Sequence, residues 1–340
     1  MMADAPVVGA LPAGARNAIT DVAGVAVGHC TLAEDACQTG VTVIRPHAAN
    51  VYVDKVPAAA TVLNGFGKSI GLVQVEELGV LETPIALTNT FSVGALAQAQ
   101  IRAAIAANPE IGRQWPTVNP LVFECNDGYL NDIQAMAVQA QHYDAALAAA
   151  SAEVAQGAVG AGRGMSSFGV KGGIGTASRV AGGYTVGALV LSNFGTPESL
   201  ILAGRPLGAE LDKRLKQAAE PEKGSIIMIV ATDAPLDARQ LRRLSLRAGT
   251  GLARTGSVYG HGSGDIVLAF STAYTVPHRA DAPMPAVPMV HESKLDPLFR
   301  AAADSVEQAI VHALWHATTV HGRDGHRRSA LREVLQDLTA

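Results

Sequence analysis

The sequence predicts an α/β or α+β fold in which alanine-rich helices cover β-sheets. Short apolar runs bounded by glycine, asparagine or proline recur along the chain and are typical of buried strands. Longer alanine-rich segments between them are typical of helices. Hydrophobic residues make up 48% of the 340 residues and aromatic residues only 4%, so the core must consist mainly of Ala, Val, Leu and Ile. The 35 glycines follow no period, which argues against a collagen-like or solenoid repeat.

Charge and cysteine content exclude several classes of function. The formal net charge of -4 is spread evenly, so no basic patch indicates a nucleic-acid partner and no polybasic stretch indicates a membrane surface. No apolar run reaches the ~18 residues that a membrane-spanning helix needs. The segment 1–16 lacks the pattern of a secretory signal. The three cysteines form no disulfide framework and no metal-ligand spacing, so we expect a cytoplasmic protein without a metal or organic cofactor.

The first half of the chain is expected to hold short strands and alanine-rich helices. Glycine turns divide the segment 17–28 into short strands, and Pro46 ends the strand that follows. A helix over 93–107 is expected to stop before Asn108 and Pro109, because proline cannot continue a helix. Further strands are expected at 40–45, 58–63, 84–90 and 118–124, and a second alanine-rich helix at 142–155.

The second half predicts the longest helices and the most apolar strands. Strands are expected at 184–192, 225–230 and 266–271, and helices at 237–253 and 297–317. In the last helix a single apolar stripe recurs at three- and four-residue steps, formed by Phe299, Ala302, Val306, Ile310 and Leu314. Residues from Thr318 onward are charged and are expected to fray.

Two glycine-rich segments invite a phosphate-binding interpretation. Residues 64–68, Asn-Gly-Phe-Gly-Lys, do not have P-loop spacing, so a backbone turn is favoured. The tract 157–175 contains Gly160-x-Gly162, but no strand runs directly into a helix around it, as a dinucleotide fingerprint requires. We expect this tract to let backbone amides approach another group closely.

An acidic and amide-rich cluster follows the strand expected at 118–124. It runs from Glu124 through Asn126 and Asp127 to Asp132. One interpretation is a capped turn followed by a helix whose N-cap is Asp132. The other is a functional site, and the residues alone leave both open.

A serine stands at the mouth of the strand expected at 225–230. Gly224 precedes Ser225, and the polar segment 213–223 before them is expected to be exposed. A chain that cut itself here would leave a serine with a free amino group. These residues taken alone favour an ordinary strand cap instead.

Polar groups at three strand ends could cooperate in nucleophilic catalysis. They are Asn193, Ser225 and the turn from Ser263 to Asp265. A nucleophile needs a base, an oxyanion donor and an orienting group. The α-amine of an N-terminal serine could be the base, since its unperturbed pKa is about 7.7–8.0. An asparagine amide can donate to an oxyanion.

Long motifs in a fixed order resemble the DmpA-like aminopeptidases, which include L-aminopeptidase/D-amidase-esterases and β-peptidyl aminopeptidases. The resemblance covers the chain from about Leu11 to Ala317. The motifs are NAITDVAGVAVG at 17–28, GVTVI at 40–44, NGFGK at 64–68, TPIALTNTF at 83–91, ECNDGYLND at 124–132, GVKGGIGTASR at 169–179, NFG at 193–195 and GSIIMIVATDAPL at 224–236.

This resemblance implies a single domain with an αββα sandwich, similar to N-terminal-nucleophile hydrolases. Family members are made as an inactive chain that cuts itself before a serine or threonine. Gly224-Ser225 matches that junction, which implies an α chain of residues 1–224 and a β chain of residues 225–340. Ser225 would be the nucleophile. Assembly as a homotetramer of αβ units is also implied.

Further site residues follow from the same resemblance. Asn193 matches the oxyanion asparagine. Ser263 and Asp265 match a hydroxyl residue and an acid that hydrogen-bond around the nucleophile; the acid is glutamate in β-peptidyl aminopeptidases, so Asp265 is shorter by one methylene. Glu124 matches the acid near the free amine of the substrate, and Asn126 matches a position that differs between subfamilies.

Lys171 matches a lysine implicated in the more distantly related nylon-oligomer hydrolases. The expected function is an autoprocessing serine aminopeptidase or amidase that releases N-terminal residues, including D- or β-amino acids, from small peptides, amides or esters. One alternative is an amidase or oligomer hydrolase for non-peptide amides that does not need Glu124. Another is an uncleaved, non-catalytic protein that binds a phosphate ligand at the glycine tract.

Overall fold

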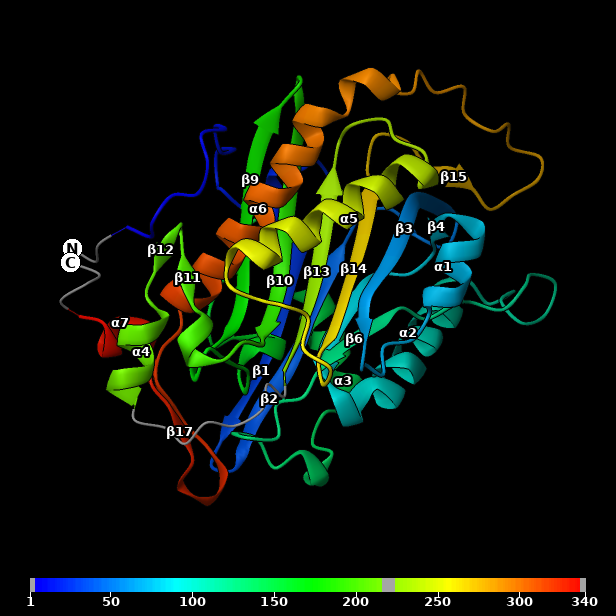
Figure 1. Ribbon diagram of the computed structural model, residues 1–340. Helices are drawn as coiled ribbons and strands as arrows, with labels where there is room; N and C mark the ends of the chain where they lie inside the picture. The colour runs from blue at the N-terminus through cyan, green and yellow to red at the C-terminus, as the bar shows by residue number, and fades with distance from the viewer. Residues whose placement is uncertain (1–3, 216–223, 337–340) are drawn as a thin grey trace.

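The computed structural model describes residues 4–215 and 224–336. Two large sheets face each other, and helices cover their outer faces (Figure 1). Within the described residues the α-helices are α1 Leu72–Leu78, α2 Val93–Ala107, α3 Ala140–Ala148, α4 Gly208–Leu215, α5 Ala238–Arg254, α6 Asp296–Trp315 and α7 Leu331–Val334.

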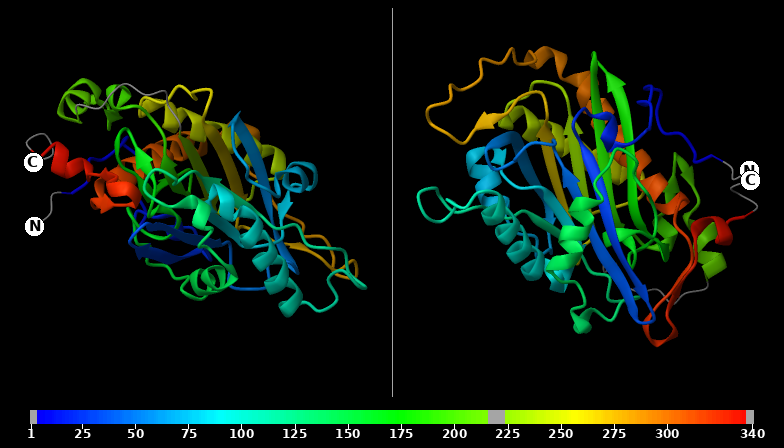
Figure 2. Two further views of the ribbon diagram at one scale, coloured as in Figure 1. Left: turned by 90° about the horizontal axis from the view of Figure 1, so that it is seen from below. Right: turned by 180° about the vertical axis from the view of Figure 1, so that it is seen from behind.

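The smaller sheet has four strands in the order β1-β2-β5-β6. Its strands are β1 Ala26–Glu34, β2 Cys37–Arg45, β5 Ile85–Asn89 and β6 Val122–Cys125. The strands β5 and β6 are parallel and are connected through α2, whereas the other pairs are antiparallel. Helices α2 and α3 pack on the outer face of this sheet, as the view from behind in Figure 2 shows.

The larger sheet has seven strands, of which six follow the order β15-β3-β14-β13-β10-β9 and β4 pairs with β3. They are β3 Asp54–Gly65, β4 Val80–Leu81, β9 Gly173–Ala181, β10 Tyr184–Asn193, β13 Ser225–Thr232, β14 Gly264–Ser271 and β15 Val276–Pro277. The central pair β13 and β14 is parallel and is connected through α5. Three two-stranded ribbons complete the strands: β7 Ser166–Ser167 with β8 Val170–Lys171, β11 Ile201–Leu202 with β12 Arg205–Pro206, and β16 Val320–His321 with β17 Arg327–Arg328.

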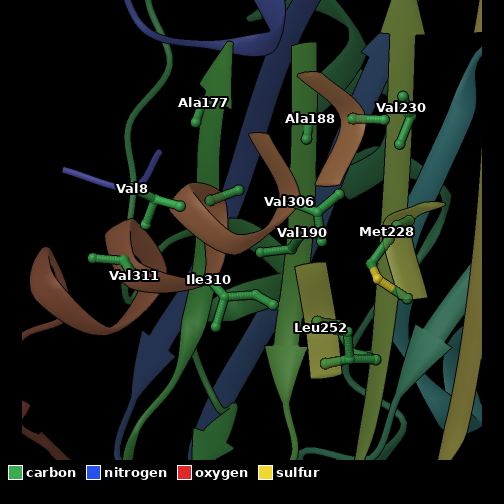
Figure 3. Close-up of a cluster of buried hydrophobic side chains, with 14 of the residues drawn as sticks. Val8, Ala177, Ala188, Val190, Met228, Val230, Leu252, Val306, Ile310 and Val311 are labelled. Carbon is green, nitrogen blue, oxygen red and sulfur yellow. The ribbon is translucent and has the colours of Figure 1, made fainter. Parts of the chain in front are cut away.

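Alternation along the strands divides the core into layers, because successive side chains of a strand point to opposite faces. On β13, Ile227 and Ile229 point between the two sheets, whereas Met228 and Val230 point toward α5 and α6. Figure 3 shows this outer layer, with Val306 and Ile310 of α6 lying over the side chains of β10. The predicted αββα sandwich is therefore the observed arrangement of layers.

Small residues let the helices lie very close to the sheets. A Cβ added at Gly175 of β9 would stand 1.8 Å from the carbonyl oxygen of Ala309 in α6. A Cβ added at Gly28 of β1 would stand 2.0 Å from the carbonyl oxygen of Ala146 in α3. Because glycine and alanine have little or no side chain, the backbones of helix and strand pack directly against each other, and the core needs few aromatic side chains.

The helix expected over 93–107 is confirmed at both ends, whereas other elements differ from expectation. The segment from Thr318, expected to fray, forms β16, β17 and α7, and Leu331 is fully buried. Of the segment 17–28, only the residues from Ala26 onward form a strand, and Ile19–Asp21 is a 3₁₀ turn. Helix α3 ends at Ala148, because the backbone of Ser151 leaves the helix to exchange two hydrogen bonds with Val27 of β1. Strand β6 begins only at Val122, because Pro120 has no N–H and the N–H groups of Asn119 and Leu121 donate to side chains instead of a neighbouring strand. Of the polar segment 213–223, the first three residues end α4 and the remainder lies outside the described residues.

A buried histidine of α6 predicts acid sensitivity. Burial lowers the pKa of His312 to about 4, from an ordinary value of 6.5, and its Nδ1 lies 2.7 Å from the carbonyl oxygen of Thr176. Since the folded-state pKa is the lower one, the unfolded chain takes up the proton first, and stability is lost as the pH falls from about 6.5 toward about 4. His312→Asn keeps an N–H donor but does not titrate.

We expect the stability difference between wild type and His312→Asn to shift by about 2 kcal/mol in favour of the variant when the pH falls from 7 to 5. Urea denaturation at fixed protein concentration measures it. An unchanged difference between the two pH values would show that His312 is not the titrating group.

Candidate active site

The strand order of the larger sheet brings three of the predicted positions into line. Asn193 ends β10 and faces Ser225 in antiparallel register. Ser225 begins β13 and faces Gly264 of β14 in parallel register. The serine therefore lies between the asparagine and the Ser263–Asp265 turn, at one end of the central strands.

Ser225 is held almost out of water. Its relative exposure is 7%, and its Oγ accepts a hydrogen bond of 3.1 Å from the backbone N–H of Gly264. Directly paired residues of antiparallel strands put their side chains on the same face of a sheet. The side chains of Asn193 and Ser225 therefore stand next to each other on the face between the two sheets.

Gly224 fits against the neighbouring strand only because it has no side chain. A Cβ at this position would stand 2.2 Å from the carbonyl oxygen of Asn193 and 2.6 Å from the Cα of Phe194. Both contacts are to backbone atoms, which cannot turn aside. The close approach of Gly224 to β10 therefore sets where Ser225 lies.

The amide of Asn193 has a fixed orientation. Its Oδ1 accepts a hydrogen bond of 2.8 Å from the backbone N–H of Ser166. Its Nδ2 donates to the carbonyl oxygen of Asn126 at 3.0 Å. An amide nitrogen carries two hydrogens. The second remains for a group placed next to Ser225.

The Ser263–Asp265 turn is buried and tied to the segment 64–68. The Oγ of Ser263 donates to Oδ1 of Asp265 at 2.7 Å, and both residues are nearly inaccessible. Asn64 donates from Nδ2 to the carbonyl oxygens of Ser263 and Gly260. Asn64 and Gly65 end β3, and the N–H of Gly67 donates to the carbonyl oxygen of Gly65, so the chain turns here as the sequence favours. The side chain of Asn64 thus supports the turn beside the serine.

Glu124, at 3% exposure, lies close to this group. Its Oε1 accepts a hydrogen bond of 2.8 Å from the backbone N–H of Lys68, and its Oε2 accepts one from the hydroxyl of Thr90. A Cβ built on Gly67 would stand 3.6 Å from Oε1 of Glu124 and 3.8 Å from the Cα of Gly264. Gly67 thus lies between the carboxylate of Glu124 and Gly264, the residue of β14 that pairs with Ser225.

The remainder of the acidic cluster forms turns, which agrees with the interpretation of a capped turn for these residues. The side chain of Asp132 accepts from the N–H of Gln134 and caps a 3₁₀ turn rather than an α-helix. Asn126 accepts from the N–H of Gly128 on its Oδ1, and its side chain is exposed.

Lys171 does not point at the serine. It is fully buried, and its Nζ donates to the carbonyl oxygens of Gly162, Met165 and Gly172 at 2.7–2.8 Å. The glycine tract packs closely on the protein itself, since a Cβ at Gly162 would stand 2.5 Å from the backbone nitrogen of Ile174. The close approach expected of the tract is thus to other parts of the chain.

Buried titratable groups surround the strand ends. Burial raises the pKa of Cys125 well above its usual range, and the carboxylates of Glu124 and Asp265 act in the same direction. Burial also raises the pKa of Asp127 to about 7. Its hydrogen bonds and the charge of Lys171 oppose that rise.

Sequence reasoning did not assign three residues that support the site. Asn64 and Thr90 lie within motifs that were singled out, so their position in those motifs was an available signal. Ser166 acts through its backbone N–H, which no residue type reveals. Among residues 4–215 and 224–336, no cluster of His, Cys, Asp or Glu is arranged to hold a metal ion. No helix in these ranges has both the length and the apolar character needed to cross a membrane.

Comparison with known proteins identifies the family of this chain. The model of peptidase family S58 matches residues 17–328. The β-peptidyl aminopeptidase BapA of Sphingosinicella microcystinivorans is 40% identical over 355 aligned positions, which cover 95% of this chain and 88% of that relative.

The chain belongs to peptidase family S58.

Solved structures of similar proteins have the same fold. A β-aminopeptidase from Burkholderia sp. superposes with a TM-score of 0.89 at 44% identity, over 97% of this chain and 96% of that one. The L-aminopeptidase D-Ala-esterase/amidase of Ochrobactrum anthropi superposes with a TM-score of 0.87 at 37% identity, over 98% of this chain and 96% of that one. The latter is described as a prototype of the serine aminopeptidases and a variant of the N-terminal-nucleophile hydrolase fold.

The predicted family, fold class and enzyme class are therefore confirmed. This S58 member is an aminopeptidase of the serine N-terminal-nucleophile hydrolase type, which sets aside the alternative of a non-catalytic phosphate-binding protein.

The close approach of Gly224 predicts that this position accepts no side chain. Gly224→Ala would push the start of β13 away from β10 and move Ser225 from Asn193. We expect aminopeptidase activity to fall at least tenfold. Gly94→Ala is the matched control, because a Cβ at Gly94 of α2 meets nothing within 4 Å. Equal activity of the two variants on an aminoacyl p-nitroanilide would contradict the argument.

Proposed function

We propose that this S58 aminopeptidase cuts its own chain between Gly224 and Ser225 and then uses Ser225 as an N-terminal nucleophile. One observation carries the proposal: the sheet register sets Ser225 between Asn193 and Gly264, where an oxyanion donor and a backbone N–H flank its hydroxyl. Family membership supports the reaction class.

Maturation begins when Oγ of Ser225 attacks the carbonyl carbon of Gly224. The C–N bond breaks, the nitrogen takes the hydroxyl proton, and an ester joins the two residues. Water hydrolyses this ester, which gives the carboxylate of residues 1–224 and the free amine of residues 225–340. A glycine before the serine suits this step, because it leaves the attacking oxygen room.

In turnover the α-amine of Ser225 takes the proton of its own hydroxyl, since the ordinary pKa of such an amine is near neutrality. Oγ attacks the substrate carbonyl, and the second N–H of the Asn193 amide stabilises the oxyanion. The leaving amine takes the proton, and water then releases the acyl group. Ser263 and Asp265 hold the turn that carries the N–H of Gly264. One oxyanion donor of this kind contributes about 3–4 kcal/mol to the transition state.

Glu124 selects substrates with a free amino group. Its carboxylate is buried and accepts one hydrogen bond on each oxygen, which leaves further lone pairs for a substrate ammonium. The substrates are small peptides, amides or esters that carry such an amine. The printed names of the relatives, a β-peptidyl aminopeptidase and an L-aminopeptidase D-Ala-esterase/amidase, support this class. Asn126 is exposed at the site and tunes the side-chain preference.

Replacing the nucleophile tests both steps. Ser225→Ala removes the attacking oxygen, so we expect a single band of 35.0 kDa on a denaturing gel and no aminopeptidase activity. Ser151→Ala, which removes an exposed hydroxyl, is the control and should give fragments 1–224 and 225–340. N-terminal sequencing of the smaller fragment should begin at Ser225. Cleavage of the Ser225→Ala chain at this bond would disprove the proposal.

Replacing the buried acid tests amine recognition. Glu124→Gln keeps the shape of the side chain but removes its charge. The ammonium group of a bound substrate then lacks its ionic partner, which costs about 2–4 kcal/mol of binding free energy. We expect kcat/KM for an aminoacyl p-nitroanilide to fall about 100-fold, with little change for an acyl ester that lacks an amine.

Little loss on either substrate would favour the alternative of an amidase for non-peptide amides, which shares Ser225, Asn193 and Asp265 but does not need Glu124. Equal large losses on both substrates would show that Glu124 supports the structure of the site and does not recognise the amine. The homotetramer of αβ units and the cytoplasmic location stay predictions.

A further inference from the structure

The side chain of Lys171 is an unusual buried charge. It is fully buried, and its Nζ donates to three main-chain carbonyl oxygens, those of Gly162 at 2.8 Å, Met165 at 2.7 Å and Gly172 at 2.8 Å. Three acceptors need three N–H donors, and only the ammonium form of lysine has three. The three carbonyls belong to one short stretch of chain, so the ammonium gathers the loop 162–172 around itself.

One of those carbonyls leads directly to the oxyanion asparagine. The peptide unit between Met165 and Ser166 accepts the lysine proton on its oxygen and donates its N–H to Oδ1 of Asn193 at 2.8 Å. A peptide group that accepts a proton from a cation becomes a stronger donor at its N–H, because linked hydrogen bonds polarise one another. The same effect passes to the Asn193 amide, whose Nδ2 then donates more strongly.

Hydrogen bonds that do not involve the lysine side chain also hold this loop in place. Its position is already fixed beside β10 by hydrogen bonds from Phe168 N–H to the carbonyl of Phe194 and between the hydroxyls of Ser167 and Ser192. Burying a charged lysine costs free energy, so burial lowers the pKa of Lys171 well below its usual range. The three carbonyl acceptors offset part of this cost, because they stabilise the ammonium form. A direct catalytic contact with Ser225 is excluded, because all three N–H donors are already engaged.

We propose that Lys171 is a positioning residue that acts through the Met165–Ser166 peptide to orient and polarise the amide of Asn193, so that this amide stabilises the oxyanion formed at Ser225. This inference rests on the proposed function, since it assumes that Asn193 is the oxyanion donor. It assigns to the glycine tract 157–175 the task of enclosing the lysine in carbonyl oxygens.

Two variants separate polarisation from simple support of the loop. Lys171→Gln keeps two N–H donors but carries no charge, and Lys171→Met keeps the apolar length without donors. Ser167→Ala is the matched control for a local structural change, because its hydroxyl bonds Ser192 and the N–H of Phe194, on either side of Asn193, but not the Met165–Ser166 peptide. The mature enzymes are assayed with an aminoacyl p-nitroanilide, and self-cleavage is followed by mass spectrometry.

We expect kcat to fall about 10- to 100-fold in Lys171→Gln, with KM within twofold of the wild type, because the oxyanion exists only in the transition state. Lys171→Met should fall at least as far. The infrared band of a ¹³C-labelled ester carbonyl, in an acyl-enzyme made with a slowly hydrolysed amino acid ester, should move to higher wavenumber in both variants. The band should stay in place in Ser167→Ala, since this variant leaves Lys171 and its hydrogen bond to the Met165–Ser166 peptide unchanged.

The proposal is overturned if Lys171→Gln matches Ser167→Ala in both kcat and band position. If Lys171→Met does not fold, Lys171→Gln decides the question, and a folded Lys171→Gln with wild-type kcat also overturns it. Mass spectrometry of the wild-type acyl-enzyme separates this failure from that of the proposed function. An acyl group on a residue other than Ser225 refutes the nucleophile, whereas an acyl group on Ser225 with an indifferent lysine refutes only the relay.

Discussion

The structure depends on the pairing of one strand with two neighbours that come from distant parts of the chain. Strand β13 is antiparallel to β10 on one side and parallel to β14 on the other. This register aligns Asn193, Ser225 and Gly264, and a shift by one residue would turn the serine to the opposite face of the sheet. The apolar residues of β13 hold the register, since both of its faces are buried between the layers of the sandwich.

Packing with small side chains reinforces that constraint. Glycines on β1 and β9 bring the backbones of α3 and α6 into direct contact with the sheets. Gly224 does the same where the chain enters β13, against the backbone of β10. Dense contacts of this kind tolerate little displacement. The crowded backbone at Gly224 therefore moves little, which keeps Ser225 beside Asn193 during the proposed maturation.

Backbone N–H groups make several of the hydrogen bonds that position the side chains around Ser225. The N–H of Gly264 reaches Oγ of Ser225, the N–H of Ser166 fixes Asn193, and the N–H of Lys68 holds Glu124. Lys171 in turn uses three carbonyls. Because these donors and acceptors are fixed by the fold, they need no reorganisation when charge develops in the reaction.

The sequence by itself predicted most of the helices and strands and a set of candidate site residues. Alanine-rich stretches and apolar runs identified helix 93–107 and the strand that Ser225 begins, because these signals depend on residues close together in the chain. The order of the motifs led to the family and to the set of site residues. Only the tertiary structure decided how these residues meet. Hydrogen bonds of the backbone decide which strands pair, where α3 ends at its bridge to β1, and how carbonyl oxygens surround Lys171. Every residue carries these backbone groups, so the residue types in the sequence do not predict them.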